Sequence, residues 1–181
     1  MSGFVVWFTG LPAAGKTTMA TIVGSELVRR ELIVDHLDGD AVRTHLSSGL
    51  GFSKEDRDTN IARIAWVASR LVRVGGVVIV SAVSPYADAR RRARELVERD
   101  APFVEVHVAT PFAECLRRDP KGFYARALKG ELQDFTGVSA PYEEPTHPEL
   151  RVDTTGTSPI RSAAAVLARL EELGLLPAAT R

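Results

Sequence analysis

The stretch Gly10-Leu11-Pro12-Ala13-Ala14-Gly15-Lys16-Thr17 decides the fold, because it separates a short apolar run from a long helical pattern. Its spacing matches the phosphate-loop pattern G-x-x-x-x-G-K-[ST] without a gap. In such a loop the glycines let backbone amides curl around phosphate oxygens, while Lys16 reaches the β- and γ-phosphates and Thr17 offers a hydroxyl to Mg²⁺. The loop then enters a helix N-terminus, whose partial positive charge favours an anion. We therefore expect residues 10–18, including Thr18, to bind the phosphates and Mg²⁺ of a nucleoside triphosphate.

Short apolar runs alternate with helical patterns on both sides of this loop. Nearly continuous apolar runs of this length are typical of strands buried on both faces of a parallel sheet. Ser53 and Asp56 form a capping pattern, Ser158 precedes a proline at a first helical position, and Asp40 is a candidate cap for a short helix. We expect strands at 4–8, 33–37, 77–80, 103–108 and 150–153, and helices at 17–30, 40–46, 53–74, 86–99, 111–117 and 159–173.

This alternation predicts an α/β fold of the P-loop NTPase type. We expect a three-layer sandwich in which a mainly parallel sheet of about five strands carries helices on both faces. A chain of 181 residues suits one domain, so residues 1–181 are expected to form a single P-loop domain. Residues 118–148 are rich in glycine, proline, charge and aromatics with weak periodicity, which predicts a lid segment.

Composition excludes several functions. The chain has 23 basic and 23 acidic residues, so its zero net charge gives no bulk attraction to nucleic acid or to an anionic membrane. The single cysteine, Cys115, makes an intrachain disulfide impossible and favours a cytoplasmic location. No apolar run approaches the roughly 20 residues of a membrane span, and the start of the sequence has no basic leader, so no signal peptide is expected.

Two carboxylates, Asp38 and Asp40, follow the second predicted strand, whereas the third ends without one. A base-reading N-K-x-D element of GTPases is absent from the sequence. Adjacent strand ends of a parallel sheet open onto one crevice, so a carboxylate there could orient Mg²⁺ through water or hold an acceptor hydroxyl. Asp38 could equally be a turn residue, and Asp40 a helix cap.

Arginines form two groups. Arg43, Arg57 and Arg63, with Asn60, lie near one predicted helix start and suit an oxyanion such as phosphate or sulfate, although a solvated helix face is the alternative. For the second group we expect only a solvated helix face: Arg90, Arg91, Arg92 and Arg94.

Further blocks follow the phosphate loop in a fixed order. They are Leu37-Asp38-Gly39-Asp40-x-x-Arg43, Gly51-Phe52-Ser53-x-x-x-Arg57-x-x-Asn60-Ile61-x-Arg63, Ser84-Pro85-Tyr86, Arg118-Asp119-Pro120-Lys121-Gly122-x-Tyr124, and Asp134-Phe135-Thr136-Gly137 through Ala140-Pro141-Tyr142-Glu143. Together the blocks resemble the adenylyl-sulfate kinase family over about residues 5–173. The resemblance implies a kinase that transfers the γ-phosphate of ATP, with Mg²⁺, to the 3′-hydroxyl of adenylyl sulfate.

The resemblance also assigns residues to roles. It implies that Phe52 and Phe135 clamp the adenine of adenylyl sulfate, since aromatic faces stack well on bases. It places the phosphosulfate and ribose on Arg43, Arg57 and Asn60, with Asp38 and Asp40 beside the acceptor. Remaining contacts implied are Lys121 over the transferring phosphoryl group, Arg118 on the ATP adenine, and the backbone around Ile61, Lys121 and Gly122.

Ser84 is the serine to which the resemblance attaches a phosphoenzyme intermediate. In-line transfer needs no covalent step, and no histidine or lysine is obviously placed to activate this hydroxyl. We therefore favour a role at the substrate site, with a helix cap before Pro85 as the alternative.

Two other readings stay open. Another small-molecule P-loop kinase, for example one for a sugar acid, would not need paired aromatics at Phe52 and Phe135, and a non-catalytic nucleotide-binding module would tolerate loss of Asp38 and Lys121. The resemblance also allows a homodimer and an ATP sulfurylase as pathway neighbour. Ala41 and Trp66 depart from the family pattern, where asparagine and glutamate are common.

Overall fold

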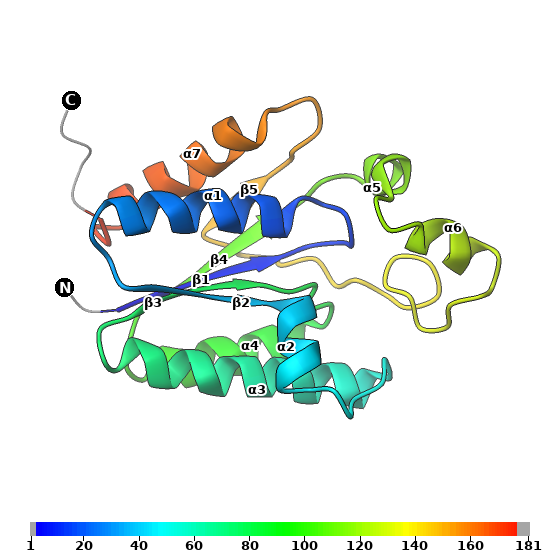
Figure 1. Cartoon of the computed structure of the whole chain (residues 1–181), viewed down its shortest axis with the longest axis horizontal. Helices are drawn as coiled ribbons and strands as arrows, with labels where there is room; N and C mark the ends of the chain where they lie inside the picture. The colour runs from blue at the N-terminus through cyan, green and yellow to red at the C-terminus, as the bar shows by residue number, and fades with distance from the viewer. Residues whose placement is uncertain (1–2, 177–181) are drawn as a thin grey trace.

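Five strands form one parallel sheet in the order β2-β3-β1-β4-β5 (Figure 1). The structure is a computed structural model that describes residues 3–176. The strands are β1 (Val5–Thr9), β2 (Val34–Asp38), β3 (Val77–Ser81), β4 (Phe103–Val108) and β5 (Leu150–Val152). The prediction of a three-layer α/β sandwich with a parallel five-stranded sheet is confirmed.

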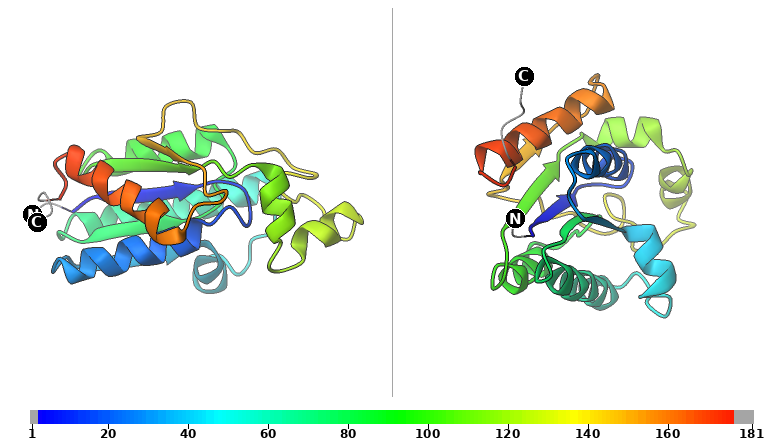
Figure 2. Two further views of the ribbon diagram at one scale, coloured as in Figure 1. Left: turned by 90° about the horizontal axis from the view of Figure 1, so that it is seen from above. Right: turned by 60° about the vertical axis from the view of Figure 1, so that its left-hand side comes forward.

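Two pairs of helices cover the two faces of the sheet, as Figures 1 and 2 show. On one face α1 (Lys16–Arg29) packs beside α7 (Pro159–Glu172), and on the other α3 (Lys54–Val72) packs beside α4 (Ala87–Val97). Three short helices, α2 (Gly39–His45), α5 (Phe112–Arg118) and α6 (Phe123–Leu128), lie toward the carboxyl ends of the strands. No helix within residues 3–176 is long and apolar enough to cross a membrane.

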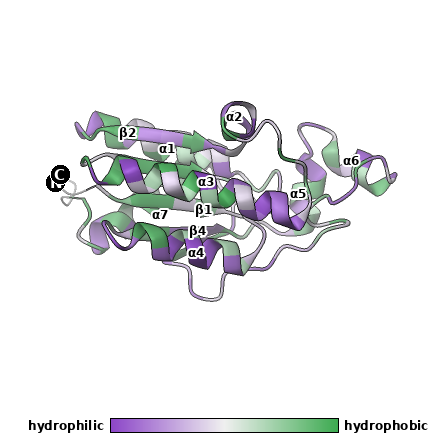
Figure 3. Cartoon of the chain, turned by 90° about the horizontal axis from the view of Figure 1, so that it is seen from below, coloured by the Kyte–Doolittle hydropathy of each residue, from purple (hydrophilic) through white to green (hydrophobic). Residues whose placement is uncertain are grey.

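Alternation along β1 supplies both halves of the core. Val6 and Phe8 pack with the side chains of α1 and α7, while Val5 and Trp7 pack with those of α3 and α4. The Trp7 ring stacks on Phe103 of β4 with ring centroids 5.5 Å apart. In Figure 3 the helices carry mixed hydrophobic and hydrophilic stripes, as expected for elements with one buried face. The three central strands, β1, β3 and β4, are buried along their whole length and read as largely apolar runs, which made them predictable, whereas the edge strands β2 and β5 mix apolar and polar residues.

The serine caps of α3 and α7 follow the sequence signals, whereas the cap expected at Asp40 does not. Ser53 Oγ accepts from the Asp56 amide at 3.1 Å, and Ser158 Oγ accepts from the Arg161 amide at 3.3 Å. The prediction that Asp40 caps the short helix is wrong, because β2 runs to Asp38 and the Asp38 carboxylate accepts the Asp40 amide. Asp40 is thereby free to project from the first turn of α2.

The lid segment, residues 118–148, contains more structure than its composition predicts. Asp119 accepts the amides of Tyr124 and Ala125, both at 3.0 Å, and so starts α6. A tight turn follows, in which Gly137 donates to the Ala140 carbonyl at 2.8 Å. Helix α6 has six residues, too few for a helical period to stand out among the neighbouring glycines and prolines.

Candidate functional site

The phosphate loop leaves β1 at Thr9 and enters α1 at Lys16. Gly10 has no room for a side chain, since a Cβ there would lie 2.5 Å from the Val108 carbonyl oxygen. Gly15 has φ +106°, a left-handed conformation that favours glycine. Lys16 Nζ donates to the carbonyls of Gly10 at 2.9 Å and Leu11 at 2.7 Å, so the loop is curled around the ammonium group.

Polar side chains from elsewhere in the chain support this loop from behind. The Ala14 carbonyl accepts from Thr110 Oγ1 at 2.9 Å and from Thr154 Oγ1 at 3.1 Å. The hydroxyl of fully buried Tyr124 donates to the Pro12 carbonyl at 3.0 Å. Sequence reasoning missed these supporting roles: Tyr124 belongs to a quoted block, but Thr110 and Thr154 belong to no motif. The loop is therefore held in shape before any phosphate arrives.

Arg118 also belongs to the support of the loop. Its Nη1 lies 2.9 Å from Thr154 Oγ1 and 3.3 Å from the Ala14 carbonyl, and its Nη2 donates to the Thr154 carbonyl at 3.1 Å. Glu114 accepts its Nε at 2.8 Å, which orients the guanidinium. These contacts place Arg118 beside the Gly15 end of the loop, at the C-terminus of α5.

Burial lowers the pKa of Lys16 and so disfavours its charged form. Desolvation lowers the pKa of its ammonium to about 8, against the opposing influence of Cys115, Asp38 and Asp40. A phosphate oxygen placed at this ammonium would restore the preference for the charged form. The loop thus holds a lysine that is prepared for an anionic partner.

Asp38 lies directly opposite Thr17 of the loop. Thr17 Oγ1 donates to Asp38 Oδ2 at 2.9 Å. Burial opposes the ionised form of Asp38, but hydrogen bonds from Ser81, Thr17 and the Asp40 and Ala41 amides outweigh it, so the pKa of Asp38 lies below its ordinary value. Because the Thr17 hydrogen is used in this bond, the hydroxyl lone pairs are left for a cation, and Mg²⁺ prefers such oxygen ligands.

Asp40, two residues after Asp38, forms an ion pair with Lys121 of the lid segment. Lys121 Nζ donates to Asp40 Oδ2, which joins the lid segment to α2. Both side chains are largely exposed, 56% for Lys121 and 79% for Asp40, and such exposed ion pairs contribute only about 0–1 kcal/mol. The pair can therefore open for a substrate at little cost.

Arg43 and Arg57 gather around Phe52. The Arg43 guanidinium carbon lies 4.6 Å from the centroid of the Phe52 ring, and Arg43 also donates to the Gly51 carbonyl at 2.6 Å. Arg57 Nε donates to the Phe52 carbonyl at 2.8 Å. The Phe52 ring itself is 58% exposed, which leaves aromatic surface free for a planar ligand.

Arg57 also links this loop to the lid segment. Its guanidinium donates to the Asp134 carbonyl and, at 3.0 Å, to Thr136 Oγ1. Arg57 therefore contacts the backbone of Phe52 and both sequence neighbours of Phe135. It links the two aromatic residues that the sequence analysis pairs. Phe135 is partly buried and meets Tyr124 edge-on, with ring centroids 5.1 Å apart.

Three residues of α3, Asn60, Ile61 and Arg63, differ in burial and in hydrogen-bond partners. Asn60 is only 6% exposed, and its Oδ1 has no hydrogen-bond partner within the described part of the chain. Ile61 is buried in the core inside α3, so its side chain is not exposed to a ligand and its backbone belongs to the helix. Arg63 turns toward α2 and donates to the Leu46 carbonyl at 2.7 Å. A buried amide oxygen without a partner favours Asn60 as a ligand contact.

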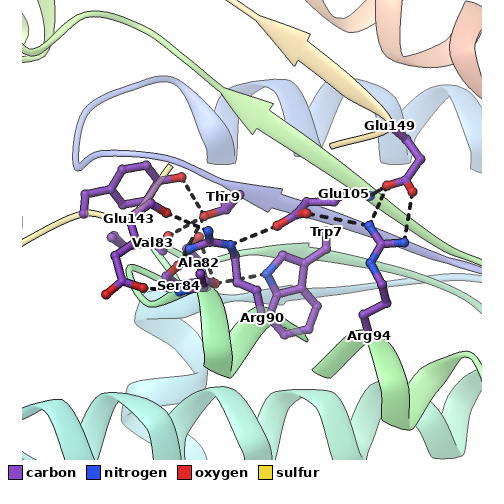
Figure 4. Close-up of polar contacts among 12 residues, drawn as sticks. Trp7, Thr9, Ala82, Val83, Ser84, Arg90, Arg94, Glu105, Glu143 and Glu149 are labelled. Carbon is purple, nitrogen blue, oxygen red and sulfur yellow. Dashed lines mark hydrogen bonds and ion pairs between the residues drawn. The ribbon is translucent and has the colours of Figure 1, made fainter. Parts of the chain in front are cut away.

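Ser84 follows β3, the strand that pairs with β2, and it lies in a more buried environment than Asp38 (Figure 4). It is 2% exposed, and its Oγ accepts from Trp7 Nε1 at 3.0 Å. Its backbone has φ +47°, which is uncommon for a non-glycine residue. The reading of Ser84 as a helix cap is wrong, because Tyr86 occupies the position before α4.

Arg90 corrects the expectation of a solvated helix face. It is 4% exposed, and its guanidinium donates to Glu105 at 2.9 Å and to the carbonyls of Ser84 and Glu143 at 2.6 Å each (Figure 4). Arg94 is partly buried and pairs with Glu149 at 2.8 Å. Arg91 and Arg92 are exposed, as expected. Nothing in the local sequence distinguishes Arg90, because its burial depends on Glu105 of β4.

A parallel sheet, a phosphate loop at the start of α1 and a carboxylate bonded to the loop threonine define a nucleotide-binding P-loop protein. A sequence model described as adenylylsulphate kinase matches residues 2–153. The chain belongs to the adenylylsulphate kinase family.

Individual relatives agree with this assignment. The chain is 48% identical over 175 residues to an adenylyl-sulfate kinase of Chloroflexus aurantiacus, covering 97% of this chain and 92% of that protein. It is 50% identical over 177 residues to a probable bifunctional SAT/APS kinase of Sorangium cellulosum, covering 98% of this chain but only 30% of that protein. The APS kinase of Mycobacterium tuberculosis in complex with AMPPNP and APS superposes with a TM-score of 0.91 at 41% identity, covering 94% of this chain and 98% of that one.

Proposed function

We propose that this chain transfers the γ-phosphoryl group of ATP to the 3′-hydroxyl of adenylyl sulfate, giving 3′-phosphoadenylyl sulfate and ADP. The observation that carries the proposal is the Thr17–Asp38 hydrogen bond of 2.9 Å. It brings the phosphate loop and an ionised carboxylate to one point, where a donor phosphate and an acceptor hydroxyl can meet in line. Membership of the family supports the choice of substrates.

The ATP side of the site is assigned to residues 10–18. Backbone amides of the loop and Lys16 hold the phosphates, and Arg118 lies at the Gly15 end, where it can reach the nucleotide. Thr17, with Asp38 beside it, would hold Mg²⁺, which when bound neutralises charge on the β- and γ-phosphates. Lys121 can leave Asp40 and add a positive charge from the lid segment.

The acceptor side lies between α2, α3 and the lid segment. Phe52 and Phe135 supply aromatic surface for adenine, and each stacked base is worth roughly 1–3 kcal/mol. Arg43, Arg57 and Asn60 supply donors and an acceptor for the phosphosulfate and ribose, and Gly122 of the lid segment offers its backbone groups. Asp38 accepts the proton of the 3′-hydroxyl as its oxygen bonds to the γ-phosphorus and the bond to ADP breaks.

Ser84 is assigned a supporting role in this scheme. Its Oγ is occupied by the Trp7 indole and is nearly inaccessible to solvent. A nucleophile needs an adjacent base and access to the reacting phosphorus. The phosphoryl group therefore passes directly between the two substrates.

The test is an ATP-dependent turnover assay with adenylyl sulfate as acceptor, in which 3′-phosphoadenylyl sulfate is followed by mass-resolved chromatography. We expect product far above the ATP hydrolysis seen without acceptor. ATP binding without product would refute the proposed acceptor and require a screen of other hydroxyl compounds.

Substitution of the paired aromatic residues distinguishes an adenylyl-sulfate kinase from a P-loop kinase that acts on a different acceptor. Phe52→Ala should raise the KM for adenylyl sulfate about 5- to 150-fold, the equivalent of losing one stacked base, with little change in the KM for ATP. Trp66→Ala is the matched control, because Trp66 is a similarly exposed aromatic side chain on α3. An unchanged acceptor KM in Phe52→Ala would favour the kinase that acts on a different acceptor.

Other assignments stay predictions. The bifunctional SAT/APS kinase relative supports an ATP sulfurylase as a pathway neighbour. A homodimer, a single domain over residues 1–181 and a cytoplasmic location rest on the sequence alone.

A further inference from the structure

A chain of hydrogen bonds runs from Asp38 back into the edge of the sheet. Ser81, the last residue of β3, lies beside Asp38 in the register of the β2–β3 pair. Ser81 Oγ is 2.8 Å from Asp38 Oδ2, and His36 Nε2 is 2.8 Å from Ser81 Oγ. His36 is two residues before Asp38 in β2, so the two side chains lie on the same face of the strand.

Chemistry fixes the direction of this chain. Asp38 accepts from Thr17 and from the Asp40 amide, as an ionised carboxylate does. The Ser81 hydroxyl therefore donates its only hydrogen to Asp38. Its oxygen must then accept from His36, which requires the tautomer with hydrogen on Nε2.

The result is a carboxylate held from several sides. Oδ2 lies between a donor from α1, Thr17, and a donor from β3, Ser81, while Oδ1 accepts the Asp40 amide. Ser81 is 2% exposed, so water cannot readily replace it as a donor. A group that must meet a reacting hydroxyl works only within a narrow range of orientation.

We propose that Ser81 and His36 are positioning residues for the phosphoryl transfer. His36 orients the Ser81 hydroxyl, and Ser81 holds the Asp38 carboxylate in the orientation that receives the 3′-hydroxyl. Neither residue touches a substrate. This inference rests on the proposed function, in which Asp38 is the group that meets the acceptor.

Substitution of Ser81 gives the main test. Ser81→Ala should lower kcat about 10- to 100-fold, the usual cost of removing an outer partner of a functional group, while both KM values stay nearly constant. Ser81→Thr keeps the hydroxyl and should recover most of the lost kcat. Ser69→Ala is the matched control, because Ser69 is equally buried but bonds to the Trp66 carbonyl in α3.

His36 gives a second, smaller test. His36→Phe should lower kcat by less than Ser81→Ala, and His36→Gln, which can offer an N–H donor, should restore it. His45→Phe is the control at an exposed histidine of α2. Nitrogen-15 NMR of the ligand-free wild type should show His36 with hydrogen on Nε2, and Ser81→Ala should change that signal.

The outcomes separate the two ideas. Wild-type turnover with unaffected kcat in Ser81→Ala, or a His36 ring protonated only at Nδ1, overturns the positioning role and leaves the proposed function intact. Equal losses in Ser81→Ala and Ser81→Thr also overturn it, because a general packing defect would then explain both. Absence of wild-type turnover overturns the proposed function itself, and the NMR result then still decides the direction of the hydrogen bonds.

Discussion

The ends of β2 and β3 lie side by side in the sheet, yet they present opposite environments. At the end of β2, Asp38 and Asp40 are polar, open to the crevice and bonded to groups that a substrate can displace or share. Just beyond the end of β3, Ser84 is buried, bonded to Trp7 and clamped by Arg90. Under the proposed function, a position at the carboxyl end of a parallel strand is not sufficient for a catalytic role, because the side chain must also be accessible to a substrate.

The comparison between the two strand ends fails if Asp38 is not needed for turnover. Asp38→Asn should lower kcat about 10²–10⁴-fold, because an amide cannot accept the proton of the acceptor hydroxyl. The free energy of unfolding should also fall, by about 1–3 kcal/mol, because the amide nitrogen of asparagine replaces one of the two oxygens that accept hydrogen bonds from Thr17, Ser81 and the Asp40 amide. Steady-state kinetics and urea unfolding measure the two effects. Near-normal kcat would place the acceptor elsewhere in the crevice.

The opposite pattern is expected at Arg90. Arg90→Met leaves the Glu105 carboxylate buried without its main partner, so the free energy of unfolding should fall by about 3–5 kcal/mol. The double variant Arg90→Met/Glu105→Gln removes the buried charge and should recover part of that loss. Both are measured by urea unfolding. A stable Arg90→Met protein with abolished turnover would mean that this corner takes part in chemistry.

Substitution of Ser84 tests the same contrast between the two strand ends, with a smaller expected loss of stability than substitution of Arg90. Ser84→Ala leaves the buried Trp7 indole N–H without its acceptor, which should cost about 1–3 kcal/mol of unfolding free energy. Turnover by the folded protein should stay within about threefold of wild type, because no covalent step passes through Oγ. Loss of turnover at unchanged stability, or phosphoserine at this position, would contradict the assignment.

The pH dependence of ATP binding tests the role of Lys16. The pKa of Lys16 is lowered to about 8 by burial, so above that pH the ligand-free lysine is neutral and must take up a proton to bind phosphate. ATP affinity should therefore weaken with rising pH, by up to about tenfold per unit above pH 8. Calorimetric titration from pH 7 to 10 measures it, and Lys16→Met, which has no titrating group, should bind weakly with a flat profile.

Several features were predictable because local sequence determines them. The central strands β1, β3 and β4 read as largely apolar runs since both faces of the sheet are covered there. Ser53 and Ser158 cap helices through contacts three residues away. Asp40 was misread as a cap because the choice between two aspartates depends on where β2 ends. That boundary is set by pairing with β3, which is a tertiary contact.

Residues that act through long-range contacts left no local signal. Arg90 stands in a run of arginines and differs from Arg91 only by facing Glu105, which is 15 positions later in the chain. Ser81 and His36 meet only when β2 and β3 pair. The candidate residues around the phosphate loop stand in contiguous motifs, which is why the sequence predicts them, whereas the residues that support them come from distant segments.

The lid segment is fastened at both ends and near its middle. Arg118 is bonded to Thr154 at one end, Glu143 is bonded to Arg90 at the other, and Arg57 holds Asp134 and Thr136 between them. A strip of chain fixed at these points is not free to swing outward as a flap. Tyr124, which is buried and bonded to the Pro12 carbonyl, holds the segment at a further point, so Lys121 lies on the short stretch between Arg118 and Tyr124, and the length of that stretch limits how far Lys121 can move.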